Sequence, residues 1–387
     1  MRSIGLLALA GAFVVGMNSA RADDIRRPGT LSRIDSTLQN ALGSLGLPPQ
    51  DAAIVTDIVI AGTMILGGMG SGATIAAAGA AGAAASAAAG AAAGASVSPT
   101  PAFSCPVFTG GTLLLTEDAC QWSTHSGPWT RQGAGDAAGT SQAAVFRAGG
   151  QKQVAENWFL GGFLGVGFAS GQAGGGYVTS TGQTYDGALA LKWVRGPWLA
   201  AAGLAFGTSV NALQREAGQI TGASTSYGGS VRLRGAYEFL FDGWYLRPRL
   251  DLELRYFNRP AFQESGGSGL AMGFGGESGV RPAIAPALEV GGRIDTADGT
   301  IVRPYLVAGV AVIPGNTSSV QAWFVSGPLA TLGSFQAPVS GPDVLGTLEA
   351  GLQVYRAHGF EAKAAYGLTA ATSYLSQSAT LRLAWHF

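Results

Sequence analysis

The sequence predicts an all-β fold: a transmembrane antiparallel β-barrel of about twelve strands, preceded by an Ala/Gly-rich helical segment. Three observations predict it: the alternating last strand, the scarcity of charge, and the repetition of alternating segments. Charged residues make up 12% of the chain, against about a quarter in soluble domains. Beyond residue 100, no uncharged apolar run is long enough for a membrane-spanning helix. This combination is typical of strands that turn one face to lipid.

The chain ends on a strictly alternating strand. Large apolar side chains occupy every second position up to the last residue: Leu381, Leu383, Trp385 and Phe387. Small or charged side chains lie between them: Arg382, Ala384 and His386. A soluble domain seldom ends on its most apolar face, because chain ends fray. The last strand of an outer-membrane barrel closes against the first and faces lipid, so this ending predicts such a barrel.

The first 22 residues are predicted to be a secretory signal peptide. Arg2 precedes an apolar run from Ile4 to Met17, and residues 19–22 supply a small-x-small cleavage site before Asp23. The alternative, an N-terminal membrane anchor, is disfavoured because the run is shorter than the roughly 18 residues that a spanning helix needs. We therefore expect the mature chain to be exported.

Residues 23–104 are predicted to form a short N-terminal passenger or plug-like region, either helical or flexible. Its first part is polar and amphipathic, with apolar residues at spacings of three and four: Leu31, Ile34, Leu38, Leu42 and Leu45. That periodicity predicts a helix, which Pro48-Pro49 would end. Residues 99–106, which begin and end with proline, are predicted to be a break before the strands.

The segment from Ile58 to Ala95 carries no charge, and its second half is Ala/Gly low-complexity sequence. Small residues recur there at four-residue intervals, which would give a helix one smooth stripe. Three interpretations remain open: a transmembrane helix, a flexible linker, and a slim helix inside a barrel lumen. The first is the weakest, because Ala and Gly are only weakly apolar and a stop-transfer helix would hold the downstream barrel at the inner membrane.

The clearest strand pattern runs from Trp244 to Tyr256. One face carries apolar side chains: Leu246, Pro248, Leu250, Leu252, Leu254 and Tyr256. The other face carries charges: Arg247, Arg249, Asp251, Glu253 and Arg255. Five charges on one face cannot form a protein core, and so continuous an apolar face would be insoluble in water. A polar lumen and a lipid exterior explain both faces.

Similar segments give a count of about twelve strands: 121–131, 141–152, 158–168, 184–194, 198–211, 224–240, 244–257, 281–294, 300–313, 343–356, 360–370 and 377–387. Short connections carry turn residues, such as Gly196-Pro197, Asp242-Gly243 and Asp298-Gly299. They alternate with long Gly/Ser-rich loops at 132–140, 169–183, 212–223, 258–280, 314–342 and 371–376. Short turns on one side and long loops on the other are typical of outer-membrane barrels.

Aromatic residues cluster near the predicted strand ends: Trp122, Trp129, Trp158, Phe159, Trp193, Trp198, Trp244, Tyr245, Tyr256, Phe257, Trp385 and Phe387. Such rings favour the lipid–water interface. We therefore predict that they form the aromatic belts of the barrel rather than scattered core positions.

The chain has two cysteines, Cys105 and Cys120. In an exported protein we expect them to form a disulfide. Closing the short loop between them would stabilise the folded state by about 3 kcal/mol in the chain-entropy model. Two free thiols are the alternative. A zinc site is disfavoured, because the nearest histidine, His125, has no ligating companion nearby in the sequence.

Residues 105–387 resemble the autotransporter β-domain of type V secretion. The similarity depends on motifs that occur in order along this region: Cys120-Gln121-Trp122, Trp129-Thr130-Arg131-Gln132, Gly149-Gly150-Gln151-Lys152, Trp158-Phe159-Leu160-Gly161-Gly162, Trp244-Tyr245-Leu246-Arg247-Pro248 and the terminal Phe387. The resemblance implies a twelve-stranded outer-membrane barrel with a helix in its lumen, which moves or anchors an N-terminal passenger at the cell surface. It also implies that the barrel-assembly machinery reads Leu381, Leu383, Trp385 and Phe387.

The upstream region departs from the family pattern. Passengers of the family are usually long and often form repetitive β-solenoids, whereas only residues 23–104 precede Cys105 after the predicted cleavage. These residues show no solenoid repeat. The departure leaves open a barrel with a plug, or a shortened relative of the family.

Ten charged residues are predicted to face the lumen: Arg232, Arg234, Arg247, Arg249, Asp251, Glu253, Arg255, Glu289, Arg293 and Glu349. They are expected to contact a lumen helix or to line a narrow polar pore. Eight strands leave room for side chains only and sixteen leave an aqueous channel. Twelve strands fall between, and a helix is about 10–12 Å across with its side chains.

The sequence predicts no enzyme site, metal site or cofactor. It has no Gly-x-Ser-x-Gly motif and no Walker lysine, and Gly165-Val166-Gly167 lacks the third glycine of a dinucleotide-binding loop. His125, His358 and His386 are far apart in the sequence. Some barrel hydrolases carry acid–base groups at the rim or outer wall, for which Asp186, Asp251 and Glu253 would be the candidates. Salt-bridged lumen residues are the preferred interpretation.

The leading hypothesis is a non-enzymatic barrel in the outer membrane of a Gram-negative bacterium, which translocates or anchors its own N-terminal segment. A passenger-less porin-like channel is the main alternative, and an outer-membrane hydrolase barrel is the third. The expected partners are outer-membrane lipid, the barrel-assembly machinery and periplasmic chaperones, with the barrel a monomer. The zero net charge gives no support for nucleic-acid binding.

Overall fold

The fold is known from a computed structural model of the whole chain. The structure describes residues 98–103, 105–132, 139–173, 178–215, 218–266, 271–327, 330–331, 333–340, 342–355, 359–372 and 374–387. The predicted signal peptide, the amphipathic stretch and the Ala/Gly-rich segment lie outside these residues, as does His358. Among the described residues, no helix is long and apolar enough to cross a membrane.

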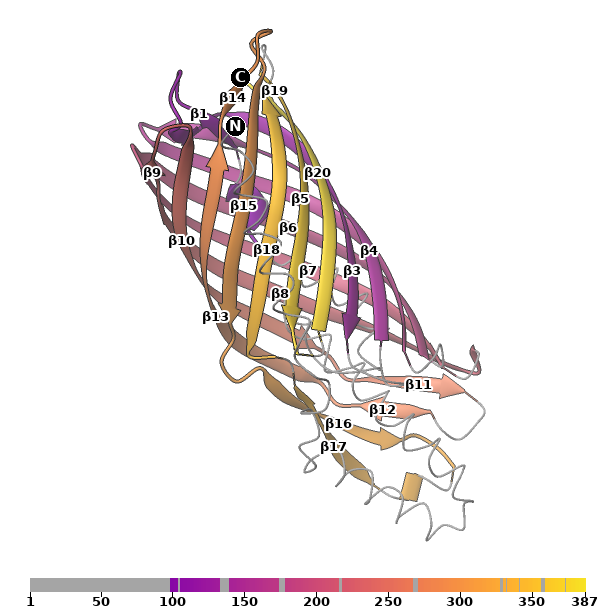
Figure 1. Cartoon of the computed structure of the whole chain (residues 1–387). Coiled ribbons are helices and arrows are strands. Elements are labelled where there is room, and N and C mark those ends of the chain that lie inside the picture. Colours follow the sequence, from indigo (N-terminus) through magenta and orange to yellow (C-terminus); the bar gives the residue numbers. More distant parts are fainter. Residues whose placement is uncertain are drawn as a thin grey trace. The chain divides into compact units, whose positions relative to one another are not determined.

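Twelve antiparallel strands form a closed barrel, which confirms the predicted fold class and strand number (Figure 1). The wall strands are β3 (Cys120–Gln132), β4 (Gly139–Ala155), β5 (Trp158–Ala173), β6 (Val178–Arg195), β7 (Trp198–Arg215), β8 (Ile220–Tyr237), β10 (Trp244–Arg259), β13 (Glu277–Gly292), β15 (Ile301–Val312), β18 (Val344–Tyr355), β19 (Phe360–Ala371) and β20 (Tyr374–His386). Each strand pairs with its neighbour in chain order, and β20 closes the ring against β3. Closure leaves the wall without a free edge, as a lipid-embedded sheet requires.

Both chain ends of the wall lie at one end of the barrel, because His386 pairs with Cys120. The predicted short turns at residues 196–197, 242–243 and 298–299 lie at this same end. Gly243 and Gly299 have φ of 79° and 78°, a left-handed conformation that glycine adopts without strain. Short turns mark the periplasmic end of an outer-membrane barrel.

The opposite end carries strands where the sequence predicts long loops. β11 (Phe262–Gly266), β12 (Met272–Phe274), β16 (Thr317–Phe324) and β17 (Ser334–Ser340) extend the sheet there, while β9 (Phe239–Leu240) and β14 (Ile294–Asp295) are short additions at the periplasmic end (Figure 1). β5 with β6 and β7 with β8 also stay paired through much of 169–183 and 212–223. The predicted loop boundaries were therefore wrong. A strand that extends beyond the membrane into water needs no apolar face. These Gly/Ser/Thr-rich stretches therefore lack the apolar alternation by which the other strands were predicted.

Side chains alternate between the two faces of the wall, as β10 shows. Leu250, Leu252 and Leu254 are exposed on the outer face, whereas Asp251 and Glu253 between them are buried inside. This is the split predicted from the sequence. The exposed leucines are stable only against lipid, because water contact over so large an apolar surface would favour aggregation.

The predicted aromatic belt is only partly correct. Exposed rings lie near the strand ends at Trp129, Trp158, Trp198, Trp244, Tyr256, Trp385 and Phe387, and Trp193 is half-buried. Four other predicted belt residues are buried inside the barrel: Trp122, Phe159, Tyr245 and Phe257. Three of these, Phe159, Tyr245 and Phe257, are the second member of an aromatic pair such as Trp244-Tyr245. Successive residues of a strand point to opposite faces, so only one member of such a pair can reach lipid.

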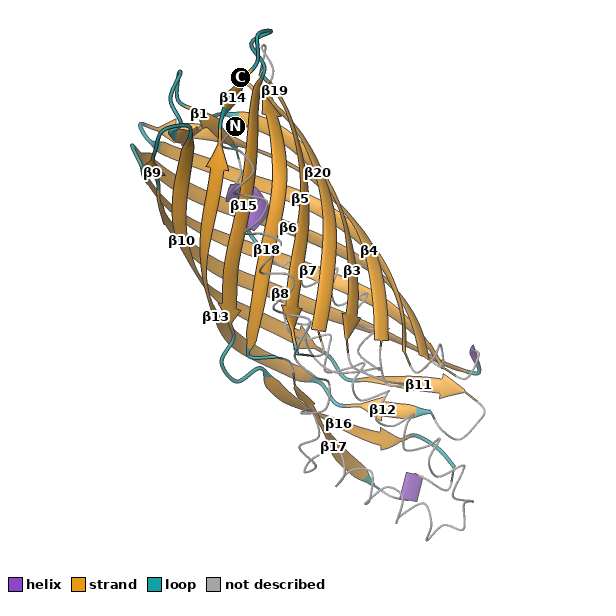
Figure 2. Cartoon of the chain, viewed as in Figure 1, coloured by secondary structure: helices purple, strands orange, loops and turns teal. Residues whose placement is uncertain are grey.

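Residues 98–103 and 105–119, the described residues before the wall, pack against its inner face. A short 3₁₀ helix, η4 (Thr100–Phe103), is drawn within the barrel in Figure 2. A two-stranded sheet follows, formed by β1 (Pro106–Phe108) and β2 (Leu115–Glu117). We call residues 98–103 and 105–119 the plug. The predicted break at 99–106 thus contains η4, and the wall itself begins at Cys120, after the plug.

Candidate functional site

The candidate site is the lumen, whose wall is built from paired charges on neighbouring strands. Arg234 of β8 lies opposite Asp251 of β10 in the strand register and donates to it at 2.7 Å. Arg232 of β8, opposite Glu253, donates to that carboxylate at 2.5 Å. Removing either partner would leave a charge without compensation in a confined space, which is costly. The pairs therefore fix the inner surface of the barrel.

The structure places most of the ten predicted lumen residues on this inner surface. Arg255 also contacts Glu253, at 2.5 Å, and Arg247 contacts Glu238 at 2.8 Å. Arg249 points into the lumen cavity described below.

The two remaining predicted carboxylates belong to a second polar cluster, on β13, β15 and β18. Glu289 accepts from the Tyr245 hydroxyl at 2.7 Å and from the Arg303 guanidinium. Glu349 accepts from the Tyr305 hydroxyl at 2.7 Å. Phenol and guanidinium donors thus satisfy both carboxylates, of which Glu289 is buried.

Arg293 lies at the periplasmic rim, where it contacts the plug. Its guanidinium donates to the carbonyl oxygens of Gly110 and Thr112, at 2.6 and 2.8 Å. It also lies 5.3 Å from the ring centroid of Phe108. The same guanidinium donates to Asp295 and lowers the pKa of that exposed carboxyl below its ordinary value. Arg293, predicted to face the lumen, therefore contacts the plug at the rim instead.

The 3₁₀ helix of the plug packs against small residues of the wall. A Cβ atom at Gly203 of β7 would lie 2.6 Å from Cβ of Pro99, so only glycine allows this approach. The Thr100 hydroxyl accepts a hydrogen bond from Arg232. The guanidinium of Arg234 lies 5.1 Å from the ring centroid of Phe103. These contacts hold residues 99–103 against the inner face of the wall.

The second half of the plug lies across the periplasmic mouth. Glu117 forms a buried ion pair with Lys192 of β6, at 2.5 Å, and accepts from the backbone N–H of Cys105. The Tyr355 hydroxyl donates to the carbonyl of Pro106 at 2.6 Å. Leu115 packs with Phe108 of β1 and with Tyr245 of the wall. Polar and apolar contacts thus connect the plug to β6, β10 and β18.

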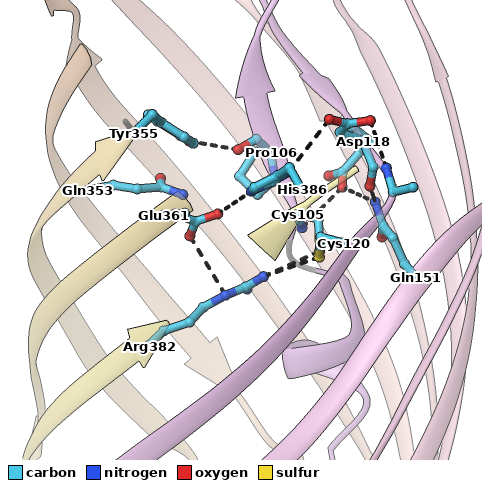
Figure 3. Close-up of polar contacts among 12 residues, drawn as sticks. Cys105, Pro106, Asp118, Cys120, Gln151, Gln353, Tyr355, Glu361, Arg382 and His386 are labelled. Carbon is cyan, nitrogen blue, oxygen red and sulfur yellow. Dashed lines mark hydrogen bonds and ion pairs between the residues drawn. A yellow bond between two sulfur atoms is a disulfide. The ribbon is translucent and has the colours of Figure 1, made fainter. Parts of the chain in front are cut away.

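A disulfide joins the plug to the first residue of the wall. Cys105 and Cys120 are bonded, with a Cα–Cα distance of 6.4 Å, and both are fully buried. The predicted pairing is therefore confirmed. The guanidinium of Arg382 lies against the two sulfur atoms, at 3.3 and 3.8 Å (Figure 3).

The end of β20 is connected to the plug through a chain of polar contacts. His386 lies 2.7 Å from Glu361 of β19 and 3.7 Å from Asp118 of the plug (Figure 3). Glu361 also lies 3.7 Å from Arg382. The residues that close the barrel seam therefore contact both the plug and its disulfide.

A cavity of about 340 Å³ remains between the plug and the wall. Thr100 and Phe103 bound it on the plug side, and Arg249, Glu349 and Thr380 on the wall side. Since its lining is rich in charge, the cavity suits a polar occupant.

Several charged residues of the lumen are absent from the sequence prediction: Glu117, Arg147, Lys192, Arg303, Lys363 and Glu361. Strand parity could have found those on β15 and β19, because Arg303 and Lys363 alternate with outward apolar residues. Glu117 precedes the wall, so no parity rule applies to it.

The residues considered for a hydrolase have structural partners. Asp186 pairs with Arg147 at 2.9 Å, and Asp251 and Glu253 form the arginine pairs described above. Within the described ranges, no three His, Cys, Asp or Glu side chains gather in a way that could hold a metal ion.

The four terminal residues assigned to the assembly signal all point outward. Leu381, Leu383, Trp385 and Phe387 are 52%, 43%, 53% and 68% exposed on the outer face. They form one apolar stripe along β20 at the seam with β3. The structure thus places them where lipid or a membrane-embedded partner could reach them.

The model of the autotransporter β-domain family matches residues 121–367. The chain belongs to the autotransporter β-domain family. The protein is therefore an outer-membrane translocator barrel of a Gram-negative bacterium. No curated protein sequence matches the chain.

Solved autotransporter structures share the fold of this translocator barrel. The translocator domain of NalP from Neisseria meningitidis is 15% identical, with a TM-score of 0.57 over 70% of this chain and 89% of the other. The β domain of the Bordetella autotransporter BrkA is 18% identical, with a TM-score of 0.51 over 70% and 100%. The transport unit of AIDA-I from Escherichia coli is 12% identical, with a TM-score of 0.54 over 73% and 93%. At these identities the likeness extends to the fold alone.

Proposed function

We propose that this autotransporter barrel translocates its own N-terminal segment, residues 23–104, through the lumen and anchors it in the outer membrane. The observation that carries the proposal is the position of residues 98–103, which lie inside the wall against β7 and β8. From there the chain runs through β1 and β2 to Cys120, at the periplasmic end of β3. Ser98, the first described residue, lines the lumen cavity.

The organisation that goes with this function has three parts. Residues 1–22 are a signal peptide removed on export, residues 23–104 are a short passenger or plug-like region, and residues 105–387 are the barrel domain. The barrel-assembly machinery and periplasmic chaperones deliver the chain, with Leu381, Leu383, Trp385 and Phe387 as the recognition stripe. The inserted barrel works as a monomer.

The barrel acts without catalysis in this proposal. The carboxylates that could serve as acid or base are engaged in ion pairs, as Asp251 is with Arg234. A carboxylate held by an arginine at hydrogen-bond distance is a poor proton acceptor. The charges of the lumen instead provide a polar path and hold the segment that lies within it.

Surface exposure of the N-terminus tests the proposal. An epitope tag inserted after Asp23 should be removed by protease added to intact cells, if the N-terminal segment crosses the membrane. A tag in the periplasmic turn at Asp242-Gly243 is the matched control, and it should be cut only after the outer membrane is permeabilised. Protection of the Asp23 tag in intact cells, with cleavage after permeabilisation, would contradict translocation.

Conductance separates this function from that of a passenger-less channel. Deleting residues 50–98 should raise single-channel conductance in planar bilayers sharply, because the segment that leads into the lumen would be lost. The full chain is the control. Equal conductance for both proteins would mean that the segment does not occupy the lumen.

A further inference from the structure

The lumen cavity carries an excess of positive charge. Seven basic side chains line it, against the three carboxylates Glu117, Glu289 and Glu349. Six of the seven pair with a carboxylate in the cavity lining or on the wall behind it: Arg147, Arg234, Arg247, Arg303, Lys363 and Arg382. The seventh is Arg249. Within the described part of the chain, its guanidinium has no ion pair or hydrogen bond, and its Nε is fully buried.

The strand register explains why Arg249 lacks a partner. Its cross-strand neighbours are Ala236 on β8 and Ala287 on β13, so neither adjacent strand offers an acceptor side chain. The carboxylates whose charge acts on it are Asp251, Glu289 and Glu349. Each of them already accepts hydrogen bonds from other side chains of the wall.

A guanidinium whose Nε is buried without an acceptor is costly, and native proteins usually satisfy such groups with an ion or water. Guanidinium groups bind planar or tetrahedral oxyanions through two parallel N–H donors. Hydroxyl groups line the same cavity at Thr124 and Ser126, and can donate further hydrogen bonds. The cavity volume of about 340 Å³ exceeds that of a small oxyanion and falls at the lower end of ligand sites.

We propose that the lumen cavity is a binding site for a small oxyanion, such as inorganic phosphate, held by the guanidinium of Arg249. The bound anion neutralises the one basic residue of the cavity lining that has no protein acceptor among the described residues. The site therefore selects for negative charge inside the barrel. This inference is independent of whether the N-terminal segment reaches the cell surface.

Titration calorimetry on the full chain, folded in detergent micelles, tests the site with inorganic phosphate as the probe. We expect saturable binding above a chloride control of equal ionic strength. Arg249→Gln should weaken it by about 10- to 100-fold, because it removes a charge-assisted pair of hydrogen bonds. Arg195→Gln, which removes the same charge from an exposed position at a turn, should leave the affinity unchanged.

Heat-modifiable migration in gel electrophoresis shows whether each variant is folded. A second variant, Arg249→Lys, keeps the positive charge but cannot donate two parallel N–H hydrogen bonds. We expect this variant to bind phosphate more weakly than the parent and more tightly than Arg249→Gln. Phosphate also should raise the unfolding temperature of the parent chain above the chloride control, a readout that needs no variant. Absence of binding to the parent, or equal affinity for the parent and Arg249→Gln, would overturn the proposal.

Discussion

Tyr245 lies directly opposite Gly291 in the register of β10 and β13, and its ring covers the backbone of that glycine. A Cβ atom at Gly291 would lie 2.3 Å from the phenol oxygen. Tyr305 has the same relation to Gly351 between β15 and β18. Each glycine makes room for a tyrosine whose hydroxyl donates to a lumen carboxylate. The packing of the wall and its electrostatics therefore depend on the same pairs.

Gly291→Ala should destabilise the barrel, because the added methyl group forces the Tyr245 ring away from Glu289. We expect the free energy of unfolding to fall by about 1–3 kcal/mol, the usual cost of overpacking, as measured by urea titration of the folded barrel. Gly235→Ala on β8 is the matched control, since no heavy atom lies within 4 Å of its added Cβ. Equal stability of the two variants would argue against the pairing.

Leu252→Arg should destabilise the inserted barrel, because Leu252 is exposed on the lipid face of β10. An arginine near the bilayer midplane costs about 2–4 kcal/mol, measurable by unfolding from liposomes. Thr369→Arg on β19 is the control; its position shares the inward parity of Lys363. A similar loss for both variants would mean that the assignment of faces is wrong.

Loss of the Cys105–Cys120 disulfide should lower the free energy of unfolding by about 3 kcal/mol, the value for a loop of this length in the chain-entropy model. The measurement compares urea unfolding with and without reducing agent. A Cys105→Ser/Cys120→Ser double variant is the control, and reductant should not affect it. Insensitivity of the parent chain to reduction would contradict a stabilising role.

Deletion of Phe387 should reduce the amount of barrel inserted in the outer membrane. The residue ends the apolar stripe of β20, and its N–H donates to the carbonyl of Ala119 in the plug. The expected observation is less folded, heat-modifiable barrel in outer-membrane fractions. Removal of Asp23 instead should leave that amount unchanged. Normal insertion without Phe387 would refute the assigned role.

The strands and faces of the membrane-embedded wall could be predicted because lipid imposes a strict alternation on each strand. β10 is the clearest case, with leucines outside and Asp251 and Glu253 inside. Turn residues such as Asp298-Gly299 then set the strand ends at the periplasmic side. Beyond the membrane this constraint disappears, and the paired strands β16 and β17 went unrecognised for that reason.

The interior of the site was less predictable than the wall. Tyr245 was assigned to the lipid belt although it shares parity with Arg247 and Arg249, which a check of strand parity would have corrected. The sequence predicted a plug-like region at 23–104 but not that residues 105–119 belong to the plug, because Glu117 and Phe108 lie in short strands with no repeating pattern. Which carboxylate serves which arginine depends on neighbouring strands distant in sequence, as with Arg303 of β15 and Glu289 of β13. No local pattern contains that information.

The plug is continuous with the first strand and is enclosed by the ring that the last strand completes. During biogenesis, the plug either enters before β20 meets β3, or it threads afterwards through an interior crowded with ion pairs. The first order of events breaks no salt bridge. The β1–β2 hairpin, joined to the start of β3 by the Cys105–Cys120 disulfide, would then be in place before the remaining strands assemble around it.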